Sequence, residues 1–244
     1  MVPVAGFSHD LFAGRRVVIS GAAGGIGRDV VAAFEACGAT VEQIDLADAF
    51  AAVSPQHRQY NCDLTDRAAL ADLADHLVAQ GPIAALVNCA GVFVRKAMDD
   101  PAAMLTWDRT IAINLTAPFM LTRALLPSLT GGAIVNITSV RADTSAELAA
   151  AYTASKGGLA ALTLAMADEL AALGIRANAI ALGEVGTAMG RTDPAISQKL
   201  FARTPIKRMA RPAEVAAACV FLASPLASFI TGATLRVDGG FLAV

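Results

Sequence analysis

Three side chains of this chain could together carry out acid–base chemistry. Tyr152 and Lys156 lie four residues apart, and Ser139 precedes the tyrosine by thirteen residues. A phenol has a pKa near ~10 and is a weak base at neutral pH. Residues at i and i+4 share one face of a helix, so the lysine ammonium would lie beside the phenol and lower its pKa. The trio could therefore move a proton to and from the hydroxyl oxygen of a bound alcohol.

A glycine-rich segment indicates a binding site for a phosphate-bearing ligand. It lies between an apolar run of strand type, Arg16–Ser20, and a predicted helix that extends to about Cys37. Its glycines are Gly21, Gly24, Gly25 and Gly27. They allow a tight turn, close approach of the backbone to a pyrophosphate and close helix–sheet packing, and the helix N-terminus supplies free N–H groups. A turn without a ligand is the alternative, which the order of strand, turn and helix disfavours.

Asp45 predicts which dinucleotide would bind. It closes a second predicted strand, 40–44, and lies 18 residues beyond Gly27. A carboxylate there accepts hydrogen bonds from the adenosine ribose and repels a 2′-phosphate. Positions 22, 23 and 46 carry no Arg or Lys that would bind such a phosphate. An aspartate that only caps a helix is the alternative, but the pattern favours NAD over NADP.

Strands and helices are predicted to alternate along almost the whole chain. A third strand ends near Asp63, and the helix after it begins at Thr65 or Asp66. Further strands are predicted at 84–87, 133–138, 176–181 and 233–237. Such alternation implies right-handed crossovers and an α/β fold, a doubly wound parallel sheet with helices on both faces.

Composition supports one α/β domain over residues 1–244. Hydrophobic residues make up 55% and charged residues 16%, which suits a buried parallel sheet.

A net charge of −2 provides no basic surface for nucleic acid or an anionic membrane. The four cysteines lie far apart without metal-binding spacing, which predicts reduced thiols, a cytoplasmic location and no metal site. The uncharged segment 215–235 is interrupted by Pro225 and Gly232, which indicates helix, turn and strand instead of a membrane span.

The ordered motifs resemble those of the short-chain dehydrogenase/reductase family in its single-domain form. The motifs are Ser20 to Gly27, Asp63, Asn88 to Gly91, Asn114, Ser139, Tyr152, Lys156, Asn178 to Thr187, and Asp238 to Gly240. The resemblance covers nearly the whole chain and implies a Rossmann fold. The expected sheet is seven-stranded and parallel, with strand order 3-2-1-4-5-6-7.

The resemblance implies a role for each motif. Tyr152 would be the general acid/base, Ser139 would hold the substrate oxygen, and Lys156 would lower the tyrosine pKa and bind the nicotinamide ribose. Asn114 would anchor a water on the proton path; its alternative role is to satisfy backbone groups in a buried helix. The implied cofactor-binding residues are Gly21, Gly24, Gly25, Ile26, Gly27, Asp45, Asp63, Leu64, Asn88, Ala90, Gly91, Tyr152, Lys156, Gly183, Val185 and Thr187, with Ile180 beside the nicotinamide.

Some positions depart from the family pattern or allow a second interpretation. Asn88 is as well suited to bracing the sheet as to touching the cofactor. Ser20 replaces the common Thr and keeps its hydroxyl, and Cys89 replaces a frequent Asn. Leu182 replaces the usual Pro, which loosens the backbone before Gly183.

By resemblance, the chain would interconvert a secondary alcohol and a ketone with NAD(H). Arg95 and Arg141 would lie near Ser139 and Tyr152, where a guanidinium can bind a carboxylate or several hydroxyls. This favours a polyol, sugar or hydroxy acid as substrate; the alternative is that both arginines pair on the surface with Asp99, Asp143 or Glu147. Residues 185–208 would form a lid over cofactor and substrate. The resemblance also implies a homotetramer, because members of the family commonly form one.

Two rival functions differ in what they require. An NADPH-dependent 3-oxoacyl or ketone reductase of the same family is opposed by Asp45. A non-catalytic dinucleotide-binding redox sensor should lack one or more of Asn114, Ser139, Tyr152 and Lys156, and all four are present.

Overall fold

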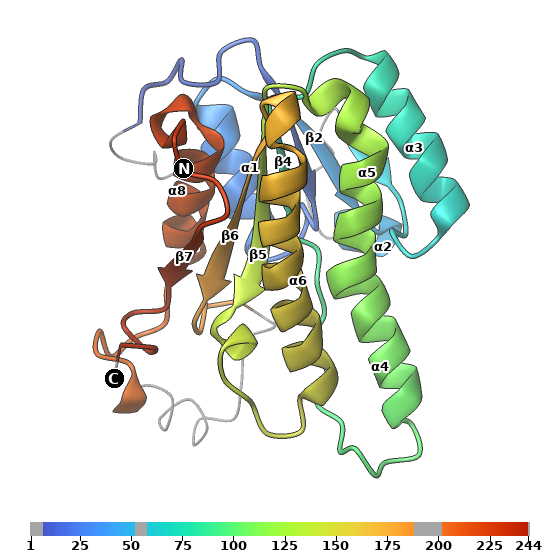
Figure 1. Cartoon of the computed structure of the whole chain (residues 1–244), viewed down its shortest axis with the longest axis vertical. Coiled ribbons are helices and arrows are strands. Elements are labelled where there is room, and N and C mark those ends of the chain that lie inside the picture. The colour runs from blue at the N-terminus through green and yellow to red at the C-terminus, as the bar shows by residue number, and fades with distance from the viewer. Residues whose placement is uncertain (1–6, 52–57, 188–201, 244) are drawn as a thin grey trace.

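Seven parallel strands form a single sheet in the order β3-β2-β1-β4-β5-β6-β7, as predicted. The computed structural model describes residues 7–51, 58–187 and 202–243 (Figure 1). The strands are β1 Arg16–Ser20, β2 Thr40–Asp45, β3 Gln59–Asn61, β4 Ala85–Asn88, β5 Ala133–Ser139, β6 Arg176–Leu182 and β7 Thr234–Val237. The third strand ends earlier than predicted because the Asp63 carboxylate accepts hydrogen bonds from the Thr65 N–H and hydroxyl, which turns the chain.

Helices cover both faces of the sheet. They are α1 Gly27–Ala36, α2 Ala47–Phe50, α3 Arg67–Ala79, α4 Ala103–Ile111, α5 Ala117–Leu129, α6 Ala150–Glu169 and α8 Pro212–Ala223. Figure 1 shows α1 and α8 together on one side, while α3, α5 and α6 lie on the other. The start of α3 is confirmed, because Asp66 caps it by accepting from the N–H groups of Ala68 and Ala69.

The strand residues alternate between two apolar cores. Val17 and Ile19 of β1 join the core beneath α1 and α8, while Val18 joins the core on the opposite face. The same alternation holds in β5, where Ile134 and Val135 belong to different cores. Both faces of the central strands are therefore buried, as the hydrophobic composition predicted.

The carboxyl ends of the strands bring the predicted motifs to one edge of the sheet. Ser20, Asp45, Asn88 and Ser139 end β1, β2, β4 and β5. Strand order reverses direction between β1 and β4, and ligands of doubly wound folds bind at such a switch point.

The uncharged stretch near the C-terminus forms separate short elements. It contains most of α8, the 3₁₀ turn Pro225–Ala227 and the start of β7, which confirms helix, turn and strand. Across the described parts of the chain, none of the helices has both the length and the apolar character needed to cross a bilayer.

Arg176 ties the end of α8 to the sheet. Its guanidinium donates to the carbonyl oxygens of Leu222 (2.8 Å), Ser224 (3.1 Å), Ala223 (3.3 Å) and Ile230 (3.3 Å). We expect Arg176→Ala to lower the free energy of unfolding by about 2–3 kcal/mol, because buried acceptors lose a charged donor. In a thermal melt the midpoint should fall by roughly 4–12 °C. Arg236→Ala, on an exposed position of β7, is the control; equal melting of the two variants would contradict the assignment.

Candidate active site

The catalytic candidates meet where β5 ends and α6 begins. Tyr152 and Lys156 lie in the first turns of α6, with the Lys156 Nζ 5.8 Å from the centre of the phenol ring. Ser139 is the last residue of β5; its hydroxyl accepts from the Arg141 N–H at 3.1 Å and lies 3.4 Å from the Leu182 carbonyl oxygen. The helix spacing and the strand end therefore bring the trio together as predicted.

Burial controls the protonation of this pair. It raises the pKa of Tyr152, while hydrogen bonding with Ser139 and the charge of Arg141 act to lower it and the Glu184 carboxylate acts to raise it. Burial lowers the pKa of Lys156 to about 8. The Lys156 ammonium donates to the Ile137 carbonyl oxygen at 2.8 Å. The phenol is therefore neutral at pH 7, and the charges that act on it come from Glu184 and Arg141. The predicted lowering of the Tyr152 pKa by Lys156 is not found, because burial raises this pKa and the Lys156 ammonium donates to a carbonyl oxygen.

Asn114 lies in a π-helical turn between α4 and α5, Ala112–Thr116. Its Oδ1 accepts from the Val92 N–H at 2.8 Å, and its Nδ2 donates to the Val92 carbonyl oxygen at 2.9 Å and to the Ser155 hydroxyl at 3.0 Å. Asn114 thus fastens the loop after β4 to α6. A Cβ at Gly91 would lie 3.3 Å from Asn114 Oδ1 and 3.4 Å from Lys156 Nζ, so this glycine lets the loop approach both side chains. The water-anchoring role stays a prediction.

The glycine-rich turn has the geometry of a phosphate cradle. Gly21 has a φ of +69°, and a Cβ there would lie 2.7 Å from the Ala90 backbone. A Cβ at Gly27 would lie 2.0 Å from the Gly21 carbonyl oxygen. The residue before α1, Ile26, provides no side-chain cap. The N-terminus of α1 therefore has no capping side chain, which suits a pyrophosphate.

The Asp45 carboxylate is fixed in the same cleft. Its Oδ2 accepts from the Ala23 N–H at 2.9 Å, and its Oδ1 accepts from the Leu46 N–H at 2.8 Å. Both bonds hold the acid at the end of β2, beside the glycine turn. The residues present therefore fit a nicotinamide dinucleotide.

Most of the predicted cofactor residues line one cleft of about 420 Å³. They are Gly21, Gly24, Gly25, Ile26, Gly27, Asp45, Asp63, Leu64, Ala90, Gly91, Tyr152, Lys156 and Thr187. Asn88 does not line it; its amide donates to Asn136 Oδ1 at 2.8 Å and to Thr122 Oγ1 at 3.4 Å, which braces the sheet. Gly183 and Val185 line the adjoining cavity. Burial raises the pKa of Cys89, which also lines the cleft, to about 12.

The cleft is also lined by residues that were not predicted to bind the cofactor, and two of them lie on one helical stretch. They are Arg109 of α4 and Ile113 of the π-helical turn. Their i, i+4 spacing places them on one face of a helix, but only the position of that helix across the cleft shows which face matters.

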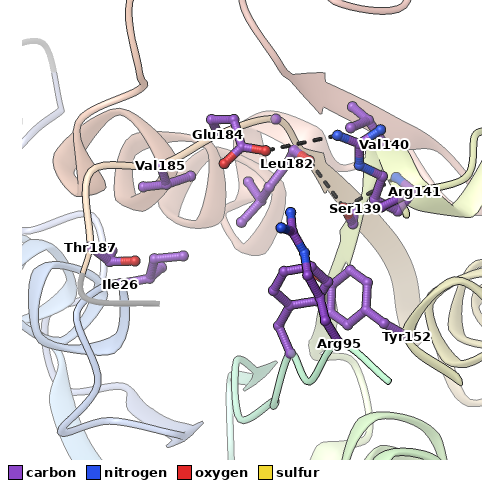
Figure 2. Close-up of a pocket in the computed structure, with 13 residues that line it drawn as sticks. Ile26, Arg95, Ser139, Val140, Arg141, Tyr152, Leu182, Glu184, Val185 and Thr187 are labelled. Atoms are coloured by element: carbon purple, nitrogen blue, oxygen red, sulfur yellow. Dashed lines mark hydrogen bonds and ion pairs between the residues drawn. The ribbon is translucent and has the colours of Figure 1, made fainter. Parts of the chain in front are cut away.

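The adjoining cavity is the candidate substrate site (Figure 2). It is lined by Tyr152 and Ser139 together with Arg95, Arg141 and Glu184. The Arg95 guanidinium lies 5.4 Å from the centre of the Phe93 ring, which packs edge-on against Tyr152 at 4.7 Å. Ile26, Tyr152, Leu182 and Thr187 line both this cavity and the cofactor cleft, so the two spaces meet at the catalytic tyrosine candidate.

The contacts of Arg141 differ from the surface ion pairs that the sequence also allowed. Arg141 lies 3.9 Å from the Glu184 carboxylate and donates to the Ser145 carbonyl oxygen at 2.9 Å. Within the described residues, neither arginine pairs with Asp99, Asp143 or Glu147. Glu184 begins the loop after β6, and its place in the cavity wall depends on the path of that loop.

Known proteins with similar sequences identify the family. Residues 21–242 match a family model described as Enoyl-(Acyl carrier protein) reductase. D-threitol dehydrogenase of Mycolicibacterium smegmatis is 37% identical over 242 residues, which cover 93% of each chain. Galactitol 2-dehydrogenase (L-tagatose-forming) of Cereibacter sphaeroides is 36% identical, covering 93% of this chain and 95% of the relative. The chain belongs to the short-chain dehydrogenase/reductase family.

A solved structure of this family has the same fold. It is a candidate NAD(P)-dependent gluconate 5-dehydrogenase of Beutenbergia cavernae with NADP bound at low occupancy. The TM-score is 0.88 at 34% identity, covering 95% of this chain and 98% of that one. The fold and family predicted from the motifs are therefore confirmed, and the chain's relatives are oxidoreductases that act on alcohols.

Proposed function

We propose that this chain is an NAD-dependent dehydrogenase that interconverts a secondary alcohol and a ketone on a polyol, sugar or hydroxy acid. The observation that carries the proposal is the meeting of the two cavities at Tyr152, with Ser139 beside it and Lys156 in the same helix. The names of the relatives, which include threitol and galactitol dehydrogenases, support a polyhydroxylated substrate.

Each residue has a defined task in this proposal. The glycine turn and the α1 N-terminus bind the pyrophosphate, and Asp45 binds the ribose hydroxyls. When bound, NAD supplies a hydride acceptor at C4 of its nicotinamide. Tyr152 takes the proton of the substrate hydroxyl as general base, while the Ser139 hydroxyl donates a hydrogen bond to the same oxygen. Lys156 binds the nicotinamide ribose, and Asn114 anchors the water through which the proton leaves.

The choice of NAD over NADP rests on Asp45. Its carboxylate, fixed by the Ala23 and Leu46 N–H groups, would repel a 2′-phosphate. The second candidate function is an NADPH-dependent 3-oxoacyl or ketone reductase, favoured by the NADP bound in the Beutenbergia protein. A non-catalytic redox sensor is disfavoured because all four catalytic candidates are present.

The experiment that tests the proposal is NADH formation with a substrate panel. Polyols, sugars, hydroxy acids and simple secondary alcohols are offered with NAD and, in parallel, with NADP. Turnover with NAD on a polyhydroxylated class is the expected result. Turnover only with NADP would favour the reductase, and tight NADH binding without any turnover would favour the sensor.

We further propose a single-domain homotetramer in the cytoplasm. Exposed apolar side chains support self-association; they include Trp107 of α4, Phe119 of α5, Leu164 of α6, and Phe229 and Leu235 at the C-terminal edge. Light scattering should give four times the chain mass of 24.9 kDa, and a monomer would contradict this.

The lid proposed for residues 185–208 falls largely outside the described residues, since only 185–187 and 202–208 of it are described.

A further inference from the structure

Glu184 presents its carboxylate to the substrate cavity. Its side chain is 27% exposed, and the nearest cation, Arg141, lies 3.9 Å away, beyond hydrogen-bond distance. In the part of the chain that the structure describes, no N–H or O–H group donates to this carboxylate. Burial raises its pKa. A half-buried carboxylate in this situation gains from any donor that a ligand brings.

The backbone fixes where this side chain starts. The Glu184 carbonyl oxygen accepts from the Ala210 N–H at 2.9 Å, and the preceding residue, Gly183, donates its N–H to the Val237 carbonyl oxygen at 3.0 Å. Gly183 packs so closely on the following loop that a Cβ there would lie 2.8 Å from Asp238 Cα. Glu184 is therefore held by two neighbouring segments at the wall of the cavity that Tyr152 and Ser139 also line.

Arg141 is held away from a closer pairing with this carboxylate. Its Nη1 donates to the Ser145 carbonyl oxygen at 2.9 Å, and its guanidinium lies 5.3 Å from the centre of the Phe241 ring. These contacts leave Arg141 close enough to stabilise the charge of Glu184 and too far to occupy its acceptor sites. Figure 2 shows Glu184 and Arg141 at the same side of the cavity as Ser139.

Glu184 also borders a second cavity. Among the residues described, it is the one lining residue that the substrate cavity shares with a neighbouring cavity of about 380 Å³. The second cavity is lined by polar groups that include Arg208, Arg236 and Asp238. A substrate whose reacting carbon lies at Tyr152 could therefore extend a hydroxylated chain along Glu184.

We propose that Glu184 is a specificity-determining residue that accepts a hydrogen bond from a second hydroxyl of the substrate. The chain thereby selects compounds with a free hydroxyl on the carbon next to the reacting carbinol. A substrate carboxylate is directed away from Glu184 by charge repulsion and toward the Arg95 guanidinium. This inference rests on the proposed dehydrogenase function and specifies its substrate class.

The test compares each substrate with its own deoxy analogue. The polyol with the highest kcat/KM in the NAD panel is measured beside the compound that lacks only the hydroxyl next to the reacting carbon. The wild-type protein should prefer the polyol by about 10–100-fold in kcat/KM, the factor expected for a hydrogen bond to a charged group. In Glu184→Gln this ratio should fall at least about tenfold. The fall should come from a lower kcat/KM for the polyol, while kcat/KM for the deoxy analogue stays unchanged.

Controls separate the inference from the proposed function. Glu169→Gln, at an exposed position at the end of α6, should keep the wild-type ratio, and NADH binding should be the same in all three proteins. A wild-type protein that does not discriminate the pair would overturn the role of Glu184, even if Glu184→Gln fails to fold. Equal losses of kcat/KM on both compounds in Glu184→Gln would also overturn the role of Glu184. Absence of turnover on every alcohol would instead remove the proposed function.

Discussion

Tyr152→Phe is expected to lower kcat for alcohol oxidation by about 10²–10⁴-fold, the contribution of a positioned proton acceptor. The phenyl ring keeps the packing of Tyr152 against Phe93 and removes only the hydroxyl. NADH affinity should therefore stay close to the wild-type value, as measured by fluorescence titration. A loss in kcat and kcat/KM together, without a loss in binding, identifies an interaction made in the transition state.

The pH profile provides a second readout of the same residue. Because burial raises the pKa of Tyr152, the neutral phenol predominates at pH 7 and the oxidation rate should rise with pH. In Tyr152→Phe this rise should disappear from the residual activity. Tyr60→Phe is the matched control, since Tyr60 is the other tyrosine of the chain and its hydroxyl donates to Glu42, in β2. A Tyr152→Phe protein with near-normal kcat would show that another group takes the proton.

Asp45→Asn is expected to reduce the preference for NAD over NADP by about 10–100-fold in kcat/KM, because a charged acceptor and its repulsion of a 2′-phosphate are both lost. The asparagine keeps one carbonyl oxygen that can accept from the Ala23 or the Leu46 N–H. The glycine turn should therefore keep its shape, and the change should appear in the ratio more than in stability.

Two comparisons make the Asp45 experiment decisive. Asp48→Asn removes a charge from an exposed position of α2 three residues away and should leave the ratio unchanged. Thermal unfolding of both variants reports any damage to the turn. The carboxylate does not select the cofactor if the wild-type protein uses NAD and NADP with equal kcat/KM. The same conclusion follows if Asp45→Asn keeps the wild-type ratio of kcat/KM for NAD to that for NADP.

The sequence was sufficient where local chemistry determines the structure. Apolar β-branched runs located β1 and β5 almost to the residue, since both faces of these strands are buried. The helix start was predicted at Thr65 or Asp66, because a side-chain oxygen at either position can accept from the free N–H groups of the first turn, and Asp66 is the residue that does so. Tyr152 and Lys156 needed only a helix to share one face.

Residues whose role depends on tertiary packing were predicted less well. Asn88 could equally face the cofactor or the sheet, and only the position of Asn136 on the neighbouring strand shows that it braces the sheet. Glu184 and Arg109 carry no local signal, since each reaches its cavity through the path of a loop or the position of a helix. The lid and the oligomer remain predictions.

The cysteine that borders the cofactor cleft has a consequence for chemical resistance. Thiol alkylation and peroxide oxidation proceed through the thiolate. Burial holds the pKa of Cys89 at about 12, against the opposing pull of the Lys156 charge, so the thiolate is a trace species at neutral pH. A neutral sulfur thus lies where the family frequently has an amide, and we expect thiolate-dependent oxidation of Cys89 at neutral pH to be slow.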